Sequence, residues 1–186
     1  MVSLLSATVA GLLIATGPAV NPATAPGPAP SIPSPHYSLL AAPERRVRAA
    51  DPQLNDLLRE GVTRSPTFAG LMTALNRSDV IVYIERLMTM PRDTVGRLTI
   101  VPMKSGARYL RIQIRQGMTR HEAIAIIGHE MQHALEVALA TEVRDASGLI
   151  ELYERIGHSS GGEHAYDTNA AQDTGRQVKR ELTATI

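Results

Sequence analysis

Residues 123–140 have the sequence AIAIIGHEMQHALEVALA, and this stretch decides the fold. At about 100° per residue, the side chains of Ile124 and Ile127 fall on the same side of a helix. His129 and His133 lie only about 40° apart and one turn along, nearly opposite those isoleucines. The stretch therefore predicts an amphipathic helix whose apolar face and histidine-bearing face are on different sides.

The start of this helix is marked by the residues TRHE, 119–122. The Thr119 hydroxyl can accept a hydrogen bond from the backbone N–H of Glu122, and the Glu122 carboxylate can reach back to Thr119. This pattern is a capping box, and the helical pattern then continues to about Thr141. We expect one long helix from this cap onward.

Shorter patterns flank the long helix on both sides. Aspartate or serine followed by proline marks two helix starts near the beginning of the domain, and Gly61 is expected to end the first of these helices. Runs rich in β-branched and aromatic residues indicate strands before the long helix. We expect helices over 51–61, 65–78, 147–157 and 165–182, and strands over 79–86, 96–103 and 107–115.

This order of helices, strands and helices predicts an α+β domain, with a small, mostly antiparallel sheet packed against the histidine-bearing helix. The strand over 107–115 alternates strictly, which is typical of a sheet with one solvated face. Leu110, Ile112 and Ile114 are expected on the buried side. The solvated side is expected to carry Tyr109, Arg111, Gln113 and Arg115.

The distribution of charged residues along the chain indicates how it is divided into domains. Residues 1–43 hold no Asp, Glu, Lys or Arg and eight of the twelve prolines of the 186-residue chain. Residues 1–25 form an apolar segment similar to a secretory signal, although no basic residue precedes it, and 26–43 read as an extended Pro/Ala-rich linker. We expect one domain over 44–186, export to a periplasm or beyond, and no stable transmembrane span.

The composition argues against several classes of function. The net charge is +1 and ERRVR, residues 44–48, is the only basic cluster, so no nucleic-acid or anionic-membrane footprint is expected. That cluster is interpreted as a solvated edge of the domain. Because the chain has no cysteine, disulfides and cysteine-ligated zinc sites are excluded.

The two histidines have the spacing that metal binding requires. Imidazoles at i and i+4 of a helix can converge on one ion at about 2.0 to 2.1 Å. A histidine on a helix is more often a surface residue or a satisfied core residue. That ordinary interpretation requires neither the second histidine nor the neighbouring Glu130, so we favour a metal site formed by His129 and His133.

The motif HEMQH, 129–133, resembles the HExxH signature of the zincin metallopeptidases. The resemblance implies one zinc ion bound by His129 and His133, with Glu130 as the general base that takes a proton from metal-activated water, and a peptide or protein as substrate. The stretches RYLR, GHEMQHALEV and YDTNAAQDTGRQV also resemble an uncharacterised bacterial group over most of residues 50–183. That second resemblance implies no particular substrate.

A catalytic zinc needs a third protein ligand. The metzincin extension is absent after His133, so a ligand from a later segment is expected, as in the gluzincins, and Asp167 is favoured. Asp167 is expected to begin a helix that packs closely through Ala170 and Ala171. Gluzincins usually have glutamate at this place, and the shorter aspartate requires the two helices to approach more closely. The alternatives that stay open are Glu142, Glu151, Glu154, Glu163 and His164.

Other residues have candidate supporting roles. Glu136 lies on the histidine face and is expected to accept a hydrogen bond from an imidazole, a role that Asp173 could also take. His158, His164 and Tyr166 are available to stabilise an oxyanion, and nothing in the spacing chooses among them. By resemblance, the strand over 107–115 would be the edge strand that aligns a peptide.

Two other functions compete with the peptidase. One is a non-catalytic binding domain that retains the zincin fold and its metal. The other is a di-metal carboxylate protein, because EMQH is also a Glu-x-x-His motif with Glu130 and His133 as ligands. The second requires another such motif on another helix, and the sequence has none.

Overall fold

The computed structural model describes residues 45–90, 94–101, 106–160 and 165–184. The predicted signal segment and linker lie outside these residues, so export remains a prediction. Among the described helices, none combines the length and apolar character that crossing a membrane requires.

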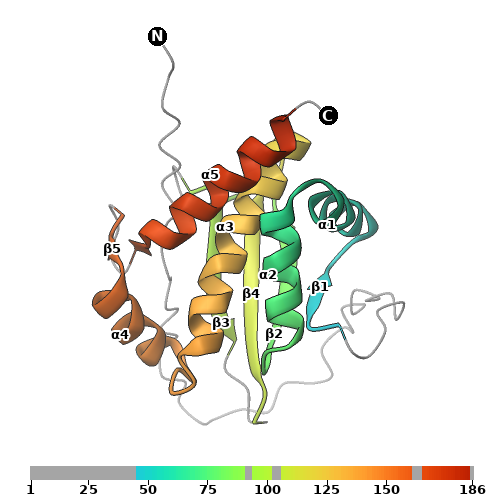
Figure 1. The fold of residues 1–186 in the computed structure, drawn as a ribbon. Helices are drawn as coiled ribbons and strands as arrows, with labels where there is room; N and C mark the ends of the chain where they lie inside the picture. The colour runs from blue at the N-terminus through green and yellow to red at the C-terminus, as the bar shows by residue number, and fades with distance from the viewer. Residues whose placement is uncertain (1–44, 91–93, 102–105, 161–164, 185–186) are drawn as a thin grey trace, which may run out of the picture.

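The described part of the chain is α+β, as expected. Helices and strands follow one another in an order that places the histidine-bearing helix, α3, directly after the sheet (Figure 1). The elements are β1 (Val47–Ala49), α1 (Pro52–Arg64), α2 (Pro66–Asn76), β2 (Val80–Leu87), β3 (Gly96–Val101), β4 (Arg108–Arg115), α3 (Arg120–Leu139), α4 (Ala146–Ile156), β5 (His158–Ser159), β6 (Tyr166–Asp167) and α5 (Asn169–Thr183).

The main sheet is mixed, and the expectation of a mostly antiparallel sheet is wrong. Its strand order is β1-β2-β4-β3, with β1 parallel to β2 and β2 parallel to β4. Only β3 runs antiparallel, beside β4. The helices α1 and α2 carry the chain from β1 back to the start of β2, and such a crossover makes neighbouring strands parallel. A separate two-stranded antiparallel sheet joins β5 and β6.

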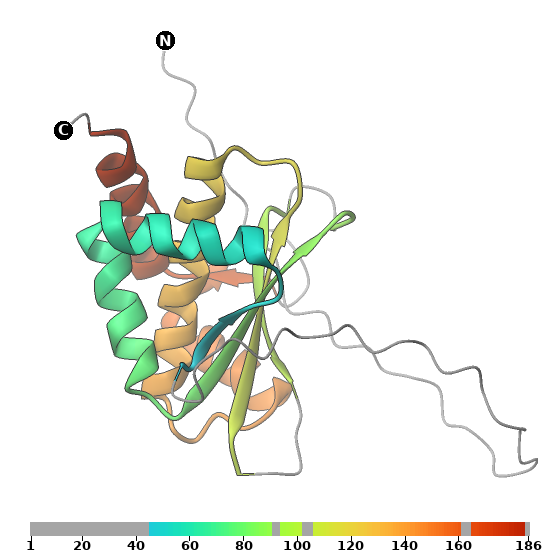
Figure 2. The ribbon, with the colours of Figure 1, turned by 90° about the vertical axis from the view of Figure 1, so that its right-hand side faces the viewer.

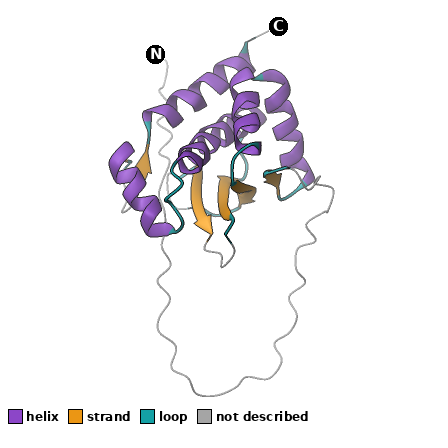
Figure 3. Cartoon of the chain, turned by 60° about the horizontal axis from the view of Figure 1, so that its bottom comes forward, coloured by secondary structure: helices purple, strands orange, loops and turns teal. Residues whose placement is uncertain are grey.

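In the described part of the chain, helices cover one face of the sheet and leave the other face uncovered. Figure 2 shows α1, α2 and α3 on the same side of the sheet, and Figure 3 shows the helices gathered over the strands. Leu110, Ile112 and Ile114 of β4 have no exposed surface, which confirms the predicted buried side of this strand. On the other face Arg111 is exposed as expected, but the expectation that Gln113 is solvated is wrong, because its side chain is buried between Glu85 and Arg97 and bonds to both.

Both ends of α3 are held by side chains. The capping box is formed in both directions between Thr119 and Glu122, as predicted. At the other end the helix stops at Leu139, slightly before the expected Thr141. There the buried guanidinium of Arg108 donates to three backbone carbonyls at the helix terminus, where carbonyls have no partners within the helix. The accepting carbonyls belong to Val137, Ala138 and Ala140. The last of these carbonyls also accepts from the Val143 backbone N–H.

Two local expectations near the start of the domain are wrong. Gly61 does not end α1, which continues to Arg64; a Cβ at Gly61 would lie 2.8 Å from the Phe68 ring, so glycine permits this close approach. The segment around Val47, interpreted as a solvated edge, forms strand β1 instead. Val47 is buried and registers with Val82 of β2, so this short strand belongs to the core.

Candidate metal centre

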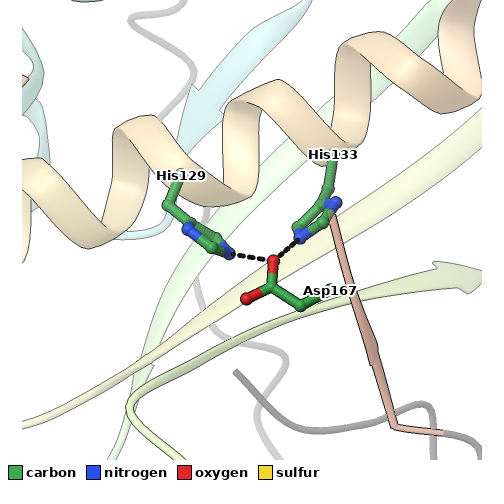
Figure 4. Close-up of side chains that lie close together, drawn as sticks. All are labelled: His129, His133 and Asp167. Carbon is green, nitrogen blue, oxygen red and sulfur yellow. Dashed lines mark ion pairs between the residues drawn. The ribbon is translucent and has the colours of Figure 1, made fainter. Parts of the chain in front are cut away.

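Three side chains from two segments converge at the middle of α3. His129 and His133 lie on consecutive turns of that helix, and Asp167 comes from β6, immediately before α5 (Figure 4). One carboxylate oxygen, Asp167 Oδ1, lies 3.3 Å from His129 Nε2 and 3.4 Å from His133 Nε2. The favoured third residue therefore meets both imidazoles, although it stands in a strand rather than at the start of a helix.

These separations match ligands around a shared cation better than hydrogen bonds. A direct N–H···O bond has a donor–acceptor distance of about 2.9 Å. Two ligand atoms at about 2.1 Å from a tetrahedral ion are about 3.4 Å apart. The ligand atoms of His129, His133 and Asp167 all lie within 4.8 Å of one another, so the group fits one divalent metal ion.

The polar atoms at this centre are buried without hydrogen-bond partners. His129, His133 and Asp167 are 5%, 3% and 2% exposed, and Glu130 is fully buried. Both Glu130 carboxylate oxygens and the Nε2 atoms of both histidines lack a partner. Unpaired buried polar and charged groups are costly unless they coordinate a metal. A cation among these atoms would remove that cost.

Glu130 lies beside the cluster, against strand β3. A Cβ built on Gly96 would come within 2.6 Å of Glu130 Oε1 and within 2.6 Å of Ile126 Cγ2. The absence of a side chain at Gly96 therefore provides the space that the Glu130 carboxylate occupies. The sequence singled out Glu130 but gave no signal for Gly96, because that contact depends on the packing of α3 on β3.

Glu136 bonds to an imidazole, as expected. The Oε2 atom of Glu136 lies 2.9 Å from His133 Nδ1. A proton on Nδ1 in this bond leaves Nε2 with its lone pair directed at the cluster. The His133 ring also packs edge-on against Tyr153, whose hydroxyl donates to the His133 carbonyl at 3.2 Å. The orientation of this ring is thus set from two sides.

Asp167 is also held by groups that the sequence did not reveal. The Thr168 backbone N–H donates to Asp167 Oδ1 at 2.7 Å, and the Gln172 amide donates to Oδ2 at 2.9 Å. Thr168 caps α5, and its hydroxyl donates to Glu136 Oε1 at 2.7 Å. The capping preference of threonine was visible in the sequence, but its bond to a distant glutamate was not.

Burial and neighbouring charges shift the ionisation of the cluster. Burial raises the pKa of the Glu130 carboxyl, against the opposing influence of both histidines. Burial also opposes ionisation of Asp167, but contacts with His129 and His133 hold its pKa well below the usual range. Burial disfavours the charged form of His133, yet Asp167 and Glu136 raise its pKa to about 9. Binding of a cation to this histidine would therefore release a proton at neutral pH.

The close approach of α3 and α5 lets the short side chain of Asp167 reach the two histidines. A Cβ at Gly175 would lie 3.2 Å from His129 Cβ, and a Cβ at Gly128 would lie 3.0 Å from Val178 Cγ2. Ala171 is fully buried, as its predicted packing role requires, whereas Ala170 is exposed. Glycine from each helix, rather than the pair of alanines, allows the two backbones to come near each other.

Among the described residues, the other candidates are not part of this group. Glu163 and His164 lie outside the described residues. Asp173 faces solvent and pairs with Arg176, so it does not support an imidazole. Of the candidate oxyanion donors, His158 is exposed and registers with Asp167 across the small sheet, whereas the Tyr166 hydroxyl bonds to a glutamate. The other proposed ligands are exposed and away from the cluster: Glu142, Glu151 and Glu154.

Comparisons with protein-family models, with curated proteins and with solved structures gave no match for this chain.

Proposed function

We propose that this protein is a zinc-dependent metallopeptidase with a zincin-like active site. Zinc would be held by His129, His133 and Asp167, and Glu130 would act as the general base. The observation that carries the proposal is the meeting of two imidazole Nε2 atoms and one carboxylate oxygen beside a second, unpartnered carboxylate. Two nitrogens and one oxygen from protein are a usual ligand set for a catalytic zinc.

The position and ionisation of Glu130 suit proton transfer. Its two carboxylate oxygens have no hydrogen-bond partner, and burial raises its pKa. A carboxylate in this state is a better proton acceptor than a fully solvated one, because its charged form is less stabilised. A bound zinc ion would supply the positive charge that lowers the pKa of water to about 7 and polarises a carbonyl group. Glu130 would take the proton of the attacking water and pass it to the leaving amine.

The outer edge of β3 is the place where we propose that a peptide substrate aligns. The sequence favoured β4 for this role, which is wrong because β4 is paired on one side with β2 and on the other with β3. Among the described strands of the main sheet, β1 and β3 are each paired on one side only, and β3 is the one next to the site, because its first residue, Gly96, lies against Glu130. An extended peptide could add to this edge by backbone hydrogen bonds.

The test compares the parent protein with Glu130→Gln and with a matched variant, Glu151→Gln. Glu130→Gln keeps the shape of the side chain but removes the proton acceptor, so metal content should be unchanged while turnover of an unstructured protein substrate falls at least about a hundredfold. Glu151 is exposed on α4. Its replacement by glutamine should leave both metal content and turnover unchanged.

The measurements are elemental analysis of purified protein and hydrolysis of a fluorescent casein. Equal hydrolysis by the parent and Glu130→Gln would refute the assignment of Glu130. A parent that holds one zinc ion per chain but cleaves no substrate would instead support a non-catalytic metal-binding domain.

A further inference from the structure

A chain of hydrogen bonds links the start of α5 to one of the imidazoles. The Thr168 hydroxyl donates to Glu136 Oε1 at 2.7 Å, and Glu136 Oε2 bonds to His133 Nδ1 at 2.9 Å. Thr168 and His133 are both nearly fully buried, so little water competes for these bonds. The bonds connect residues of α3 with a residue that precedes α5.

The same threonine also restrains the carboxylate on the other side of the cluster. Its backbone N–H donates to Asp167 Oδ1, the oxygen that faces both histidines. Its hydroxyl accepts from the Ala171 backbone N–H at 3.1 Å and so caps α5. One residue thus contacts one member of the cluster directly and another through Glu136, while it fixes the position of the helix itself.

We propose that Thr168 is a positioning residue for metal binding, acting through Glu136 on His133. The inference rests on the proposed metal centre but not on its peptidase activity. A hydroxyl bond that holds Glu136 in place also holds the His133 ring with Nε2 directed at the cluster. Partners of this outer kind usually change metal affinity by about 10- to 100-fold.

The alternative explanation is that the Thr168 hydroxyl serves only as a helix cap. The chain provides a matched control at the start of α3. There the Thr119 hydroxyl donates to Glu122 Oε2 at 2.7 Å and accepts from the Glu122 backbone N–H at 3.4 Å. Thr119 makes the same two types of bond as Thr168, with a glutamate that contacts no histidine of the cluster.

The experiment uses the full chain stripped of metal, with the variants Thr168→Val, Thr168→Ser and Thr119→Val. Zinc affinity is measured by competition with a chromophoric chelator, and the visible absorption of added Co²⁺ reports the coordination geometry. Thr168→Val replaces the hydroxyl by a methyl group of similar size, so we expect zinc affinity to fall about tenfold or more, with an altered Co²⁺ spectrum. Thr168→Ser should restore both values. Thr119→Val should lower thermal stability alone.

Each outcome separates this inference from the proposed function. If Thr168→Val has the same zinc affinity and the same Co²⁺ spectrum as the parent, the positioning role of Thr168 is overturned, but the proposed metal centre is not. Equal losses of affinity in Thr168→Val and Thr119→Val would show a general effect of losing a cap, and would also overturn it. A parent chain that binds no zinc would overturn both proposals. Absence of peptidase activity would leave the affinity comparison unaffected.

Discussion

The junction between β4 and the end of α3 gives a stability prediction that is independent of any activity. Arg108 is 3% exposed, and its guanidinium donates to three carbonyls at the end of α3 and to Asp79. Arg108→Met keeps much of the aliphatic volume and removes all of these donors. The carbonyls of Val137 and Ala138 and the charge of Asp79 then lose this donor, while the Ala140 carbonyl still accepts from the Val143 backbone N–H.

The magnitude follows from burial. Each buried carbonyl left without a donor costs about 1 to 3 kcal/mol. Water that reaches these carbonyls in the variant would reduce the total cost. Two buried carbonyls, those of Val137 and Ala138, lose their donor, so we expect Arg108→Met to lower the free energy of unfolding by about 2 to 6 kcal/mol. For a domain of this size, that loss lowers the melting temperature by roughly 10 °C.

The control is Asp79→Asn, which removes the charge opposite Arg108 but leaves the helix carbonyls bonded. The Asp79 side chain is 51% exposed, so its ion pair is screened by water and should contribute less than about 1 kcal/mol. Urea unfolding followed by circular dichroism, in the presence of a chelator, measures both variants without a contribution from bound metal. Equal losses in the two variants, or a loss below about 1 kcal/mol for Arg108→Met, would refute the capping argument.

Two further predictions concern the site and the pH dependence of stability. In Gly96→Ala, the new methyl group meets Glu130 Oε1 at 2.6 Å, so peptide hydrolysis should fall about tenfold or more while zinc content measured by elemental analysis stays at the parent value. Burial opposes ionisation of Glu181, but hydrogen bonds hold the pKa of this carboxyl below its ordinary value, and the bond from Ser65 has the largest effect among them. This stabilisation is therefore present above about pH 4.3 and is lost as the pH falls through the lower folded-state pKa. The stability difference between the parent and Glu181→Gln, measured by urea unfolding, should shrink over that range.

Features that depend on interactions between residues close together in the chain were predictable from the sequence. The capping box at Thr119 and the Ser65–Pro66 start of α2 are where the sequence placed them, because each depends on bonds within a few residues. The same holds for the alternation in β4, whose buried side chains follow directly from the pleat. The HExxH spacing also predicted that His129 and His133 lie close together, because both are on one regular helix.

The features that the sequence did not reveal depend on contacts between distant segments. Nothing in Val47–Ala49 shows that it pairs with β2, since a strand of this length has too few residues for a recognisable pattern. The parallel arrangement of β2 and β4 depends on β3 being placed outside β4 rather than between the two strands. Asp167 was found as a candidate by its chemistry, but its place in a strand follows from pairing with His158.

The identity of the proposed third ligand, Asp167, is linked to the packing of two helices. An aspartate has one methylene fewer than the glutamate usual in gluzincins, so its backbone must lie nearer to the histidines. In this chain Gly175 brings α5 close enough to α3 that an added Cβ would lie 3.2 Å from His129 Cβ. Asp167, just before α5, then places a single oxygen 3.3 and 3.4 Å from the two Nε2 atoms. A longer acid at this position would have to fold back or displace the helix, because the side chain at this position is packed among its neighbours and only 2% exposed. The small residue in α5 and the short acid before it thus satisfy the same geometric requirement.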